Sequence, residues 1–145
     1  MDEKKCCTVV NHYYGCCGGC RNVGPETENV YSTEEFVCGK WIDGKPIYRK
    51  VITGSLANES GNSLVFADVS GLNIDRLVDL YGSATNKAET GQIVLQTSYN
   101  RADALPVAVN MVYDAGAGEL QYYFVNVGGF YSGASAYVVI EYTKK

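Results

Sequence analysis

The stretch PVAVNMVYDAGAGELQYYFVNV, residues 106–127, decides the fold class of this chain. Every second residue is apolar or aromatic along both of its halves, from Val107 to Tyr113 and from Leu120 to Phe124, and Asp114–Gly118 between them contains two glycines. A period of two is typical of β-strands that bury one face, so the stretch predicts an antiparallel pair joined by a turn. The residues expected to face a core are Val107, Val109, Met111, Tyr113, Leu120, Tyr122 and Phe124.

The same pattern, with many aromatic and β-branched residues, runs from Tyr31 to the end of the chain. Asp43–Pro46 suits a hairpin connection, because Gly44 tolerates a positive φ and Pro46 suits a strand start. Several short strands at this spacing predict an all-β fold over residues 31–145, an antiparallel β-sandwich with jelly-roll-like character. The other expected strands are Phe36–Ile42, Ile47–Thr53, Ser63–Val69, Gln92–Tyr99 and Ser135–Thr143.

One stretch inside this region departs from the period of two. Ile74, Leu77, Val78 and Tyr81 stand at positions i, i+3, i+4 and i+7 behind Asn73, a residue type that caps helices. This spacing is typical of the apolar face of a helix. We therefore predict one short helix at residues 73–81.

The first 30 residues have a different composition. Cysteine and glycine are frequent, aliphatic side chains are few, and Val23–Glu28 has the composition of a linker. Such a segment cannot offset its ordering entropy with a core of its own. We therefore expect residues 1–30 to be an irregular anchor that neighbouring subunits or a larger assembly order. The side chains expected to anchor it are Cys6, Cys7, Tyr13, Tyr14, Cys16, Cys17 and Cys20.

The same segment contains the most plausible metal ligands. Cys17 and Cys20 have the two-residue spacing that lets both thiolates reach one tetrahedral zinc ion. A second such pair is absent from the sequence, so three alternatives stay open: a structural zinc site, disulfides, or small residues packed in an assembly. The candidate ligands are Cys6, Cys7, His12, Cys16, Cys17 and Cys20.

The residue types that catalysis needs are poorly placed. The one histidine, His12, lies in the coreless segment, and Cys38 has only Glu34, Glu35 and Lys40 near it in the sequence. Asp75 and Asp79 fall on the polar face of the expected helix beside Arg76, as on a solvated surface. We therefore expect that the chain is not an enzyme.

Charge and hydropathy restrict the partners. The net charge of −4 provides no basic patch for nucleic acid. No stretch approaches the roughly 20 apolar residues that a membrane helix requires. We expect neither a nucleic-acid partner nor membrane insertion.

A glycine-rich stretch, Asn126–Gly133, contains two adjacent aromatic residues. Aromatic rings on flexible loops are common at sugar-binding surfaces, so Phe130 and Tyr131 are candidates for surface binding of host-surface or mucus glycans. The alternative is a wide turn whose rings pack into the core.

Residues 31–52, YSTEEFVCGKWIDGKPIYRKVI, resemble a module found in fibre and fibre-like proteins of bacteriophages from gut bacteria. The most specific part is GKWIDGKPIYRK, residues 39–50. Residues 74–82 and 137–144 are similar to the middle and the end of that module. The resemblance covers residues 31–145 and leaves the cysteine-rich segment unmatched.

The resemblance implies an all-β knob, usually trimeric, that is exposed on the virion and takes part in attachment. The resemblance assigns no binding residue to this chain. A trimer would also cover edge strands that a lone sandwich leaves open. The rings expected in a subunit interface or the core are Trp41, Tyr48, Tyr122 and Tyr123.

The length of the anchor bears on location. The knob follows only about 30 residues, which leaves no room for a fibre shaft. The sequence therefore favours a short fibre or decoration protein anchored to the capsid, a head fibre, over a receptor-binding tip of the tail or baseplate. A stand-alone carbohydrate-binding module and a metal-binding regulatory protein are the hypotheses from other classes.

Overall fold

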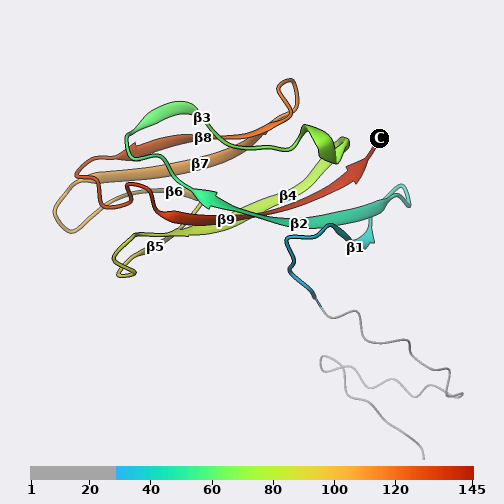
Figure 1. Ribbon diagram of the computed structural model, residues 1–145, viewed down its shortest axis with the longest axis horizontal. Helices are drawn as coiled ribbons and strands as arrows, with labels where there is room; N and C mark the ends of the chain where they lie inside the picture. Colours follow the sequence, from blue (N-terminus) through green and yellow to red (C-terminus); the bar gives the residue numbers. More distant parts are fainter. Residues whose placement is uncertain (1–28) are drawn as a thin grey trace, which may run out of the picture.

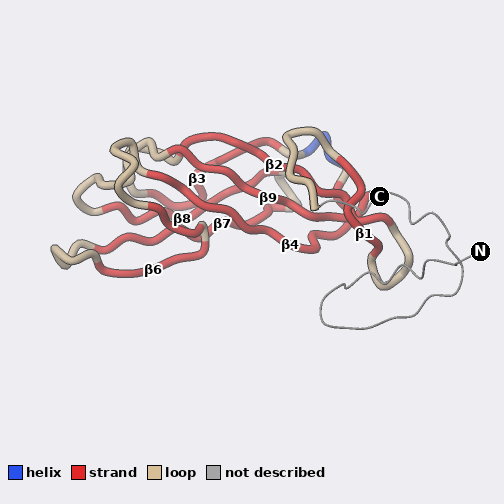
Figure 2. The backbone as a smooth tube through the Cα atoms, turned by 90° about the horizontal axis from the view of Figure 1, so that it is seen from below, coloured by secondary structure: helices blue, strands red, loops and turns tan. Residues whose placement is uncertain are grey.

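The computed structural model describes residues 29–145, which form a β-sandwich (Figures 1 and 2). One 3₁₀ turn, η1 (Ser70–Leu72), is the only helical element among these residues. The strands are β1 (Phe36–Lys40), β2 (Pro46–Ser55), β3 (Gly61–Asp68), β4 (Ile74–Thr85), β5 (Gln92–Val94), β6 (Gln96–Asn100), β7 (Pro106–Asp114), β8 (Glu119–Asn126) and β9 (Ser135–Lys144).

Two antiparallel sheets make the two layers. Sheet 1 has the strand order β1-β2-β9-β4-β5, and sheet 2 has the order β3-β8-β7-β6. Strands early and late in the chain are nested, because β2 pairs with β9 in sheet 1 while β3 pairs with β8 in sheet 2. The predicted antiparallel β-sandwich is confirmed, and this nesting is its jelly-roll-like feature.

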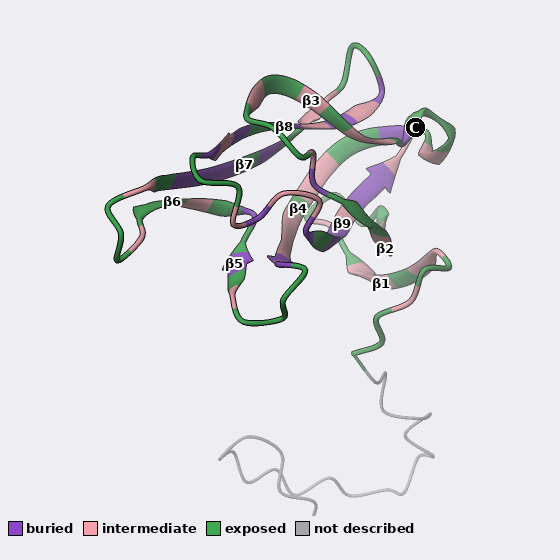
Figure 3. Cartoon of the chain, turned by 60° about the vertical axis from the view of Figure 1, so that its left-hand side comes forward, coloured by how far each residue is buried: buried purple, intermediate pink, exposed green. Residues whose placement is uncertain are grey.

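The core lies between the two sheets. Figure 3 shows that buried residues are concentrated on β7 and β9. All the residues predicted to face the core along β7 and β8 are buried except Tyr113, which is partly buried against it. On β9, Val138, Ile140 and Tyr142 face sheet 2 and are fully buried, and Val139 on the opposite face is only 2% exposed. β9 is therefore covered on its inner face, and on its outer face from Val139 to Thr143, whereas Tyr137 on the outer face is 46% exposed.

The predicted helix at residues 73–81 is wrong, because these residues form the first part of β4. Two β-bulges interrupt the pairing of β4 with β9, and each adds one residue on the β4 side. As a result, the first core-facing residues of the strand, Ile74, Leu77 and Leu80, recur every three residues instead of every two. The bulges thus give a strand the apolar spacing of a helix.

The strand expected at Gln92–Tyr99 is divided between the two sheets. β5 pairs with β4 in sheet 1, and β6 pairs with β7 in sheet 2. Leu95 lies between them with its side chain buried. Its N–H donates to the Gly82 carbonyl at 3.1 Å, and its carbonyl accepts from the Met111 N–H at 3.1 Å. One residue therefore links the two sheets through its backbone.

The two ends of the sandwich differ. The turns at 41–45, 70–72 and 115–118 lie at the end that holds the C-terminus, which we call the proximal end. Loops 56–60, 86–91, 101–105 and 127–134 gather at the opposite, distal end (Figure 1).

Two buried asparagines brace loops at the distal end. The side-chain carbonyl of Asn86 accepts from the backbone N–H groups of Thr90 and Gly91. That of Asn126 accepts from the N–H of Tyr131 at 3.0 Å. These loops therefore have a defined shape.

The segment before β1 is tied to the proximal part of the core through Glu35. The Glu35 carboxylate accepts hydrogen bonds from the Tyr142 hydroxyl and from Lys144 Nζ, the latter at 2.5 Å. The Tyr142 ring stacks on Tyr48 with centroids 6.0 Å apart. Burial acts to raise the pKa of Glu35, but the hydrogen bonds from Lys144 and Tyr142 outweigh it and hold the pKa below its usual value.

We predict that Gly82→Ala destabilises the fold by more than about 2 kcal/mol. A Cβ at Gly82 would overlap the backbone carbonyl of Tyr137 on β9, which cannot move without disturbing the sheet. The matched control is Gly71→Ala, where a Cβ meets nothing within 4 Å. Urea unfolding of both variants measures the difference, and equal midpoints would contradict the close approach of β4 to β9.

We also predict that Glu35→Gln is destabilising at pH 7 by roughly 1 to 2 kcal/mol. Because the folded state lowers the pKa of Glu35 from 4.5, this stabilisation is present above that pH and is lost as the pH falls through the folded pKa. The stability gap between wild type and variant therefore narrows in acid. Urea unfolding at pH 7 and pH 3.5 tests this, with the exposed Glu34→Gln as control, and a gap independent of pH would refute it.

Candidate functional site

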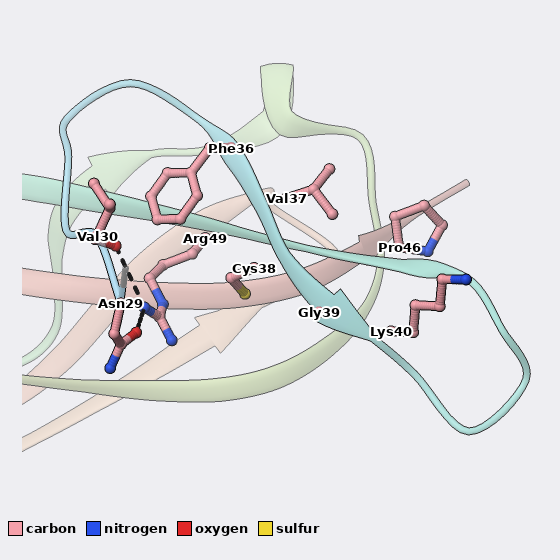
Figure 4. Close-up of a pocket in the computed structure, with 9 residues that line it drawn as sticks. All are labelled: Asn29, Val30, Phe36, Val37, Cys38, Gly39, Lys40, Pro46 and Arg49. Atoms are coloured by element: carbon pink, nitrogen blue, oxygen red, sulfur yellow. Dashed lines mark hydrogen bonds between the residues drawn. The ribbon is translucent and has the colours of Figure 1, made fainter. Parts of the chain in front are cut away.

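An open groove of about 710 Å³ lies along β1, where the described chain begins (Figure 4). Its lining is mostly apolar, with one arginine and one lysine. The lining residues are Asn29, Val30, Phe36, Val37, Cys38, Gly39, Lys40, Pro46 and Arg49.

A β-bulge in β1 shapes this groove. Val37 pairs with Tyr48 and Gly39 with Ile47, so Cys38 is the extra residue between them. Val37 is left 57% exposed, while Cys38 is partly buried in the groove beside Arg49 (Figure 4). Among residues 29–145, β1 pairs with β2 alone, so no other described strand pairs with its second edge.

Arg49 on β2 holds the incoming chain against the outer face of sheet 1. Its Nε donates to Glu141 Oε1 at 2.7 Å, and its Nη1 donates to Asn29 Oδ1 and, at 3.3 Å, to the Val30 carbonyl. The guanidinium also lies 4.8 Å from the centroid of the Tyr31 ring. One side chain thus binds β9 and the first three described residues.

Arg49 and Glu141 form an ion pair that is largely shielded from solvent. The side chains of Arg49 and Glu141 are only 11% and 15% exposed. Burial acts to lower the pKa of Arg49, but the hydrogen bond and the charge of Glu141 outweigh it and raise the pKa. Burial, together with the Tyr31 hydrogen bond, raises the pKa of Tyr81 beside them. The charge of Arg49 therefore persists throughout the physiological pH range.

The chemistry of the groove suits binding rather than reaction. Burial and the charge of Glu141 raise the pKa of the Cys38 thiol, which disfavours the reactive thiolate. Among residues 29–145 no group of three or more His, Cys, Asp or Glu side chains could hold a metal ion. What the groove offers is an open strand edge, an apolar floor and two basic side chains.

The N-terminal candidates lie outside the described residues. These are the predicted zinc ligands and anchoring side chains, Cys6, Cys7, His12, Tyr13, Tyr14, Cys16, Cys17 and Cys20. The zinc, disulfide and packing alternatives for them remain predictions.

The predicted surface-binding role of Phe130 and Tyr131 does not match their positions. Tyr131 is only 2% exposed, and Phe130 is partly buried against the core. The Arg101 guanidinium covers the Phe130 ring at 3.7 Å from its centroid, and the Tyr131 hydroxyl lies 3.3 Å from that of Tyr99. Burial and the Tyr99 hydrogen bond raise the pKa of Tyr131 to about 12. The loop places both rings inward, as the alternative predicted.

The four rings expected in an interface or the core have different positions. Tyr122 is buried in the core, and Tyr48 is partly buried against it. Tyr123 is 44% exposed on the outer face of sheet 2. Trp41 is partly buried in the β1–β2 hairpin, with the Arg76 guanidinium 5.9 Å from its ring centroid.

The Arg49–Glu141 pair and Glu35 were not predicted as site residues. Arg49 and Glu141 are 92 positions apart in the sequence, and only the β2–β9 pairing brings them together. One signal was available, because Glu141 is the single charged residue within the predicted strand Ser135–Thr143. A lone charge in such a strand indicates a specific partner.

Comparison with known proteins gives no relative: no family model, no curated protein and no solved structure matches this chain. Within residues 29–145, no helix has the length and apolar character needed to cross a membrane.

We predict that Arg49→Met destabilises the fold by about 2 to 3 kcal/mol, because it leaves Glu141 partly buried without its cation. The double variant Arg49→Met/Glu141→Leu should recover most of this loss. Lys45→Met, which removes the exposed pair with Asp75, is the control and should have little effect. Thermal unfolding of the four proteins measures this, and a double variant less stable than Arg49→Met would contradict it.

Proposed function

We propose that this chain is a bacteriophage virion structural protein, a short fibre or decoration protein at the virion surface. Residues 1–30 anchor it to the capsid or to other virion proteins, and residues 31–145 form a trimeric β knob for attachment. The resemblance of residues 31–52 to phage fibre modules supports this proposal. The alternative within the same class is a receptor-binding tip of the tail or baseplate.

The observation that carries the proposal is the difference between the two ends of the sandwich. The incoming chain is bound to the proximal half of sheet 1 by Arg49 and Glu35, whereas the long loops gather at the distal end (Figure 1). A protein that is held at one side and presents shaped loops at the other is suited to display.

The groove along β1 supports the anchoring part of the proposal. Residues 1–28 join the described chain at Asn29, which itself lines the groove. An open strand edge beside an apolar floor is the kind of surface on which an extended segment of another protein adds as a strand. In the proposal, this side of the knob faces the capsid.

The proposal includes no enzymatic role. The described carboxylates of Glu35, Asp75 and Glu141 each pair with a basic side chain that is part of the fold. The second candidate class, a stand-alone carbohydrate-binding module, lacks its expected aromatic platform because Tyr131 is buried and Phe130 is covered.

We predict that deletion of residues 2–22 leaves a soluble, β-rich protein that no longer joins virions. The deleted segment contains the anchor and none of the described fold. Particles are purified from infected cells that express tagged wild type or the deletion, and the bound protein is quantified by immunoblotting.

The control for this experiment is Lys87→Ala/Glu89→Ala in a distal loop, which should join particles as wild type does. Wild-type protein that stays in the soluble fraction and is absent from particles would contradict the proposed function. Circular dichroism checks that the deleted protein keeps its β structure.

A further inference from the structure

We infer that the outer face of sheet 2 is the surface through which copies of this chain associate. This inference rests on the proposed function, because it assigns the contact surface of the proposed trimer. It is drawn from the charge, exposure and extent of that face.

Sheet 2 is almost free of charge. None of its four strands contains a lysine or an arginine. Its acidic residues are Asp68, Asp114 and Glu119, and the strand register places all three together at the proximal rim. The rest of the face is neutral, as is typical of the centre of a protein interface.

The outward-facing side chains form uncharged rows across the sheet. Val65, Gln121 and Val112 make one row over β3, β8 and β7. Tyr123 and Asn110 lie in the next row, at the centre of the face. Val65 is 56% exposed, Val112 is 54% exposed and Tyr123 is 44% exposed, so apolar surface meets solvent on three adjacent strands.

Sheet 1 differs on its outer face. Arg49, Glu141 and Asp79 form a charged row across β2, β9 and β4. The described chain also begins on this face, where Arg49 binds the Val30 carbonyl. In the proposed function the outer face of sheet 1 is thus the anchor side, and the outer face of sheet 2 is turned away from it (Figure 1).

The distribution of charge favours a second copy of the chain as the partner that covers the outer face of sheet 2. The chain has a net charge of −4, so most approaches between copies bring like charges together. The neutral face avoids this repulsion, because around a threefold axis each copy can bring one part of this uncharged face against a different part of the same face on its neighbour. It also offers no cation for an acidic partner and few anions for a basic one.

The extent of the face is sufficient. Four strands of about eight residues, spaced about 4.8 Å apart and rising about 3.3 Å per residue, cover about 500 Å². Three copies that each bury this face against their neighbours remove about 1,500 Å² from solvent in all, an area within the range of specific protein interfaces.

The test is a pair of charge insertions on matched tyrosines. Tyr123→Glu puts a charge at the centre of the sheet 2 face, whereas Tyr137→Glu puts it on the outer face of sheet 1. Both residues lie on interior strands and have similar exposure, 44% and 46%. The full chain is used under reducing conditions, so that cysteine cross-links do not contribute, and its mass is measured by light scattering over a range of concentrations.

The expected result is an oligomer for wild type and for Tyr137→Glu, and a dissociation constant raised at least tenfold for Tyr123→Glu. Val112→Lys, with the opposite charge on the neighbouring strand, should act in the same direction. Circular dichroism identifies any variant that fails to fold, and the other variant then decides the outcome.

Two results would overturn the inference in distinguishable ways. A wild-type oligomer that survives both Tyr123→Glu and Val112→Lys, or that is dissociated by Tyr137→Glu instead, refutes this face and leaves the proposed trimer standing. A wild-type monomer at all concentrations refutes both the face and the trimer.

Discussion

The structure depends on β9, which pairs with a strand on each side and buries Val138, Ile140 and Tyr142 against sheet 2. β9 pairs along most of its length with β2 on one side and with β4 on the other, so it fixes the register of three strands at once. A strand in this position must be apolar on both faces, and Tyr137–Tyr142 is apolar apart from Glu141 and the tyrosine hydroxyls. The register of sheet 1, and the positions at which the sheet can hold charged side chains, follow from this strand.

Two adjacent residues of β9 connect that core to the incoming chain. Glu141 points to the outer face and holds Arg49, which binds Asn29 and Val30. Tyr142 points to the inner face and donates to Glu35. Residues 29–35 are therefore bound from both faces of one sheet, so the candidate site and the stability of the fold share the same residues.

The sequence predicts the elements whose pattern is local, and fails where partners are distant. β7 and β8 pair without a bulge, so every second residue along each strand faces the core. The core-facing residues of the stretch 106–127 could therefore be predicted directly from its sequence. β4 was predicted as a helix because its two bulges change the apolar period, and a bulge is visible only through the partner strand. The change of sheet at Leu95 and the Arg49–Glu141 pair depend on contacts that no local pattern encodes.

The way the chain joins the sandwich has a mechanical consequence. A pull on residue 29 acts first on the contacts of Val30 with Arg49 and of Ser32 with Val51, then on the short strand β1 at the edge of sheet 1. These contacts can break while β2, β9 and β4 keep their pairing. A load applied at residue 29 would therefore open the edge of sheet 1 before it reaches the pairing of β2, β9 and β4.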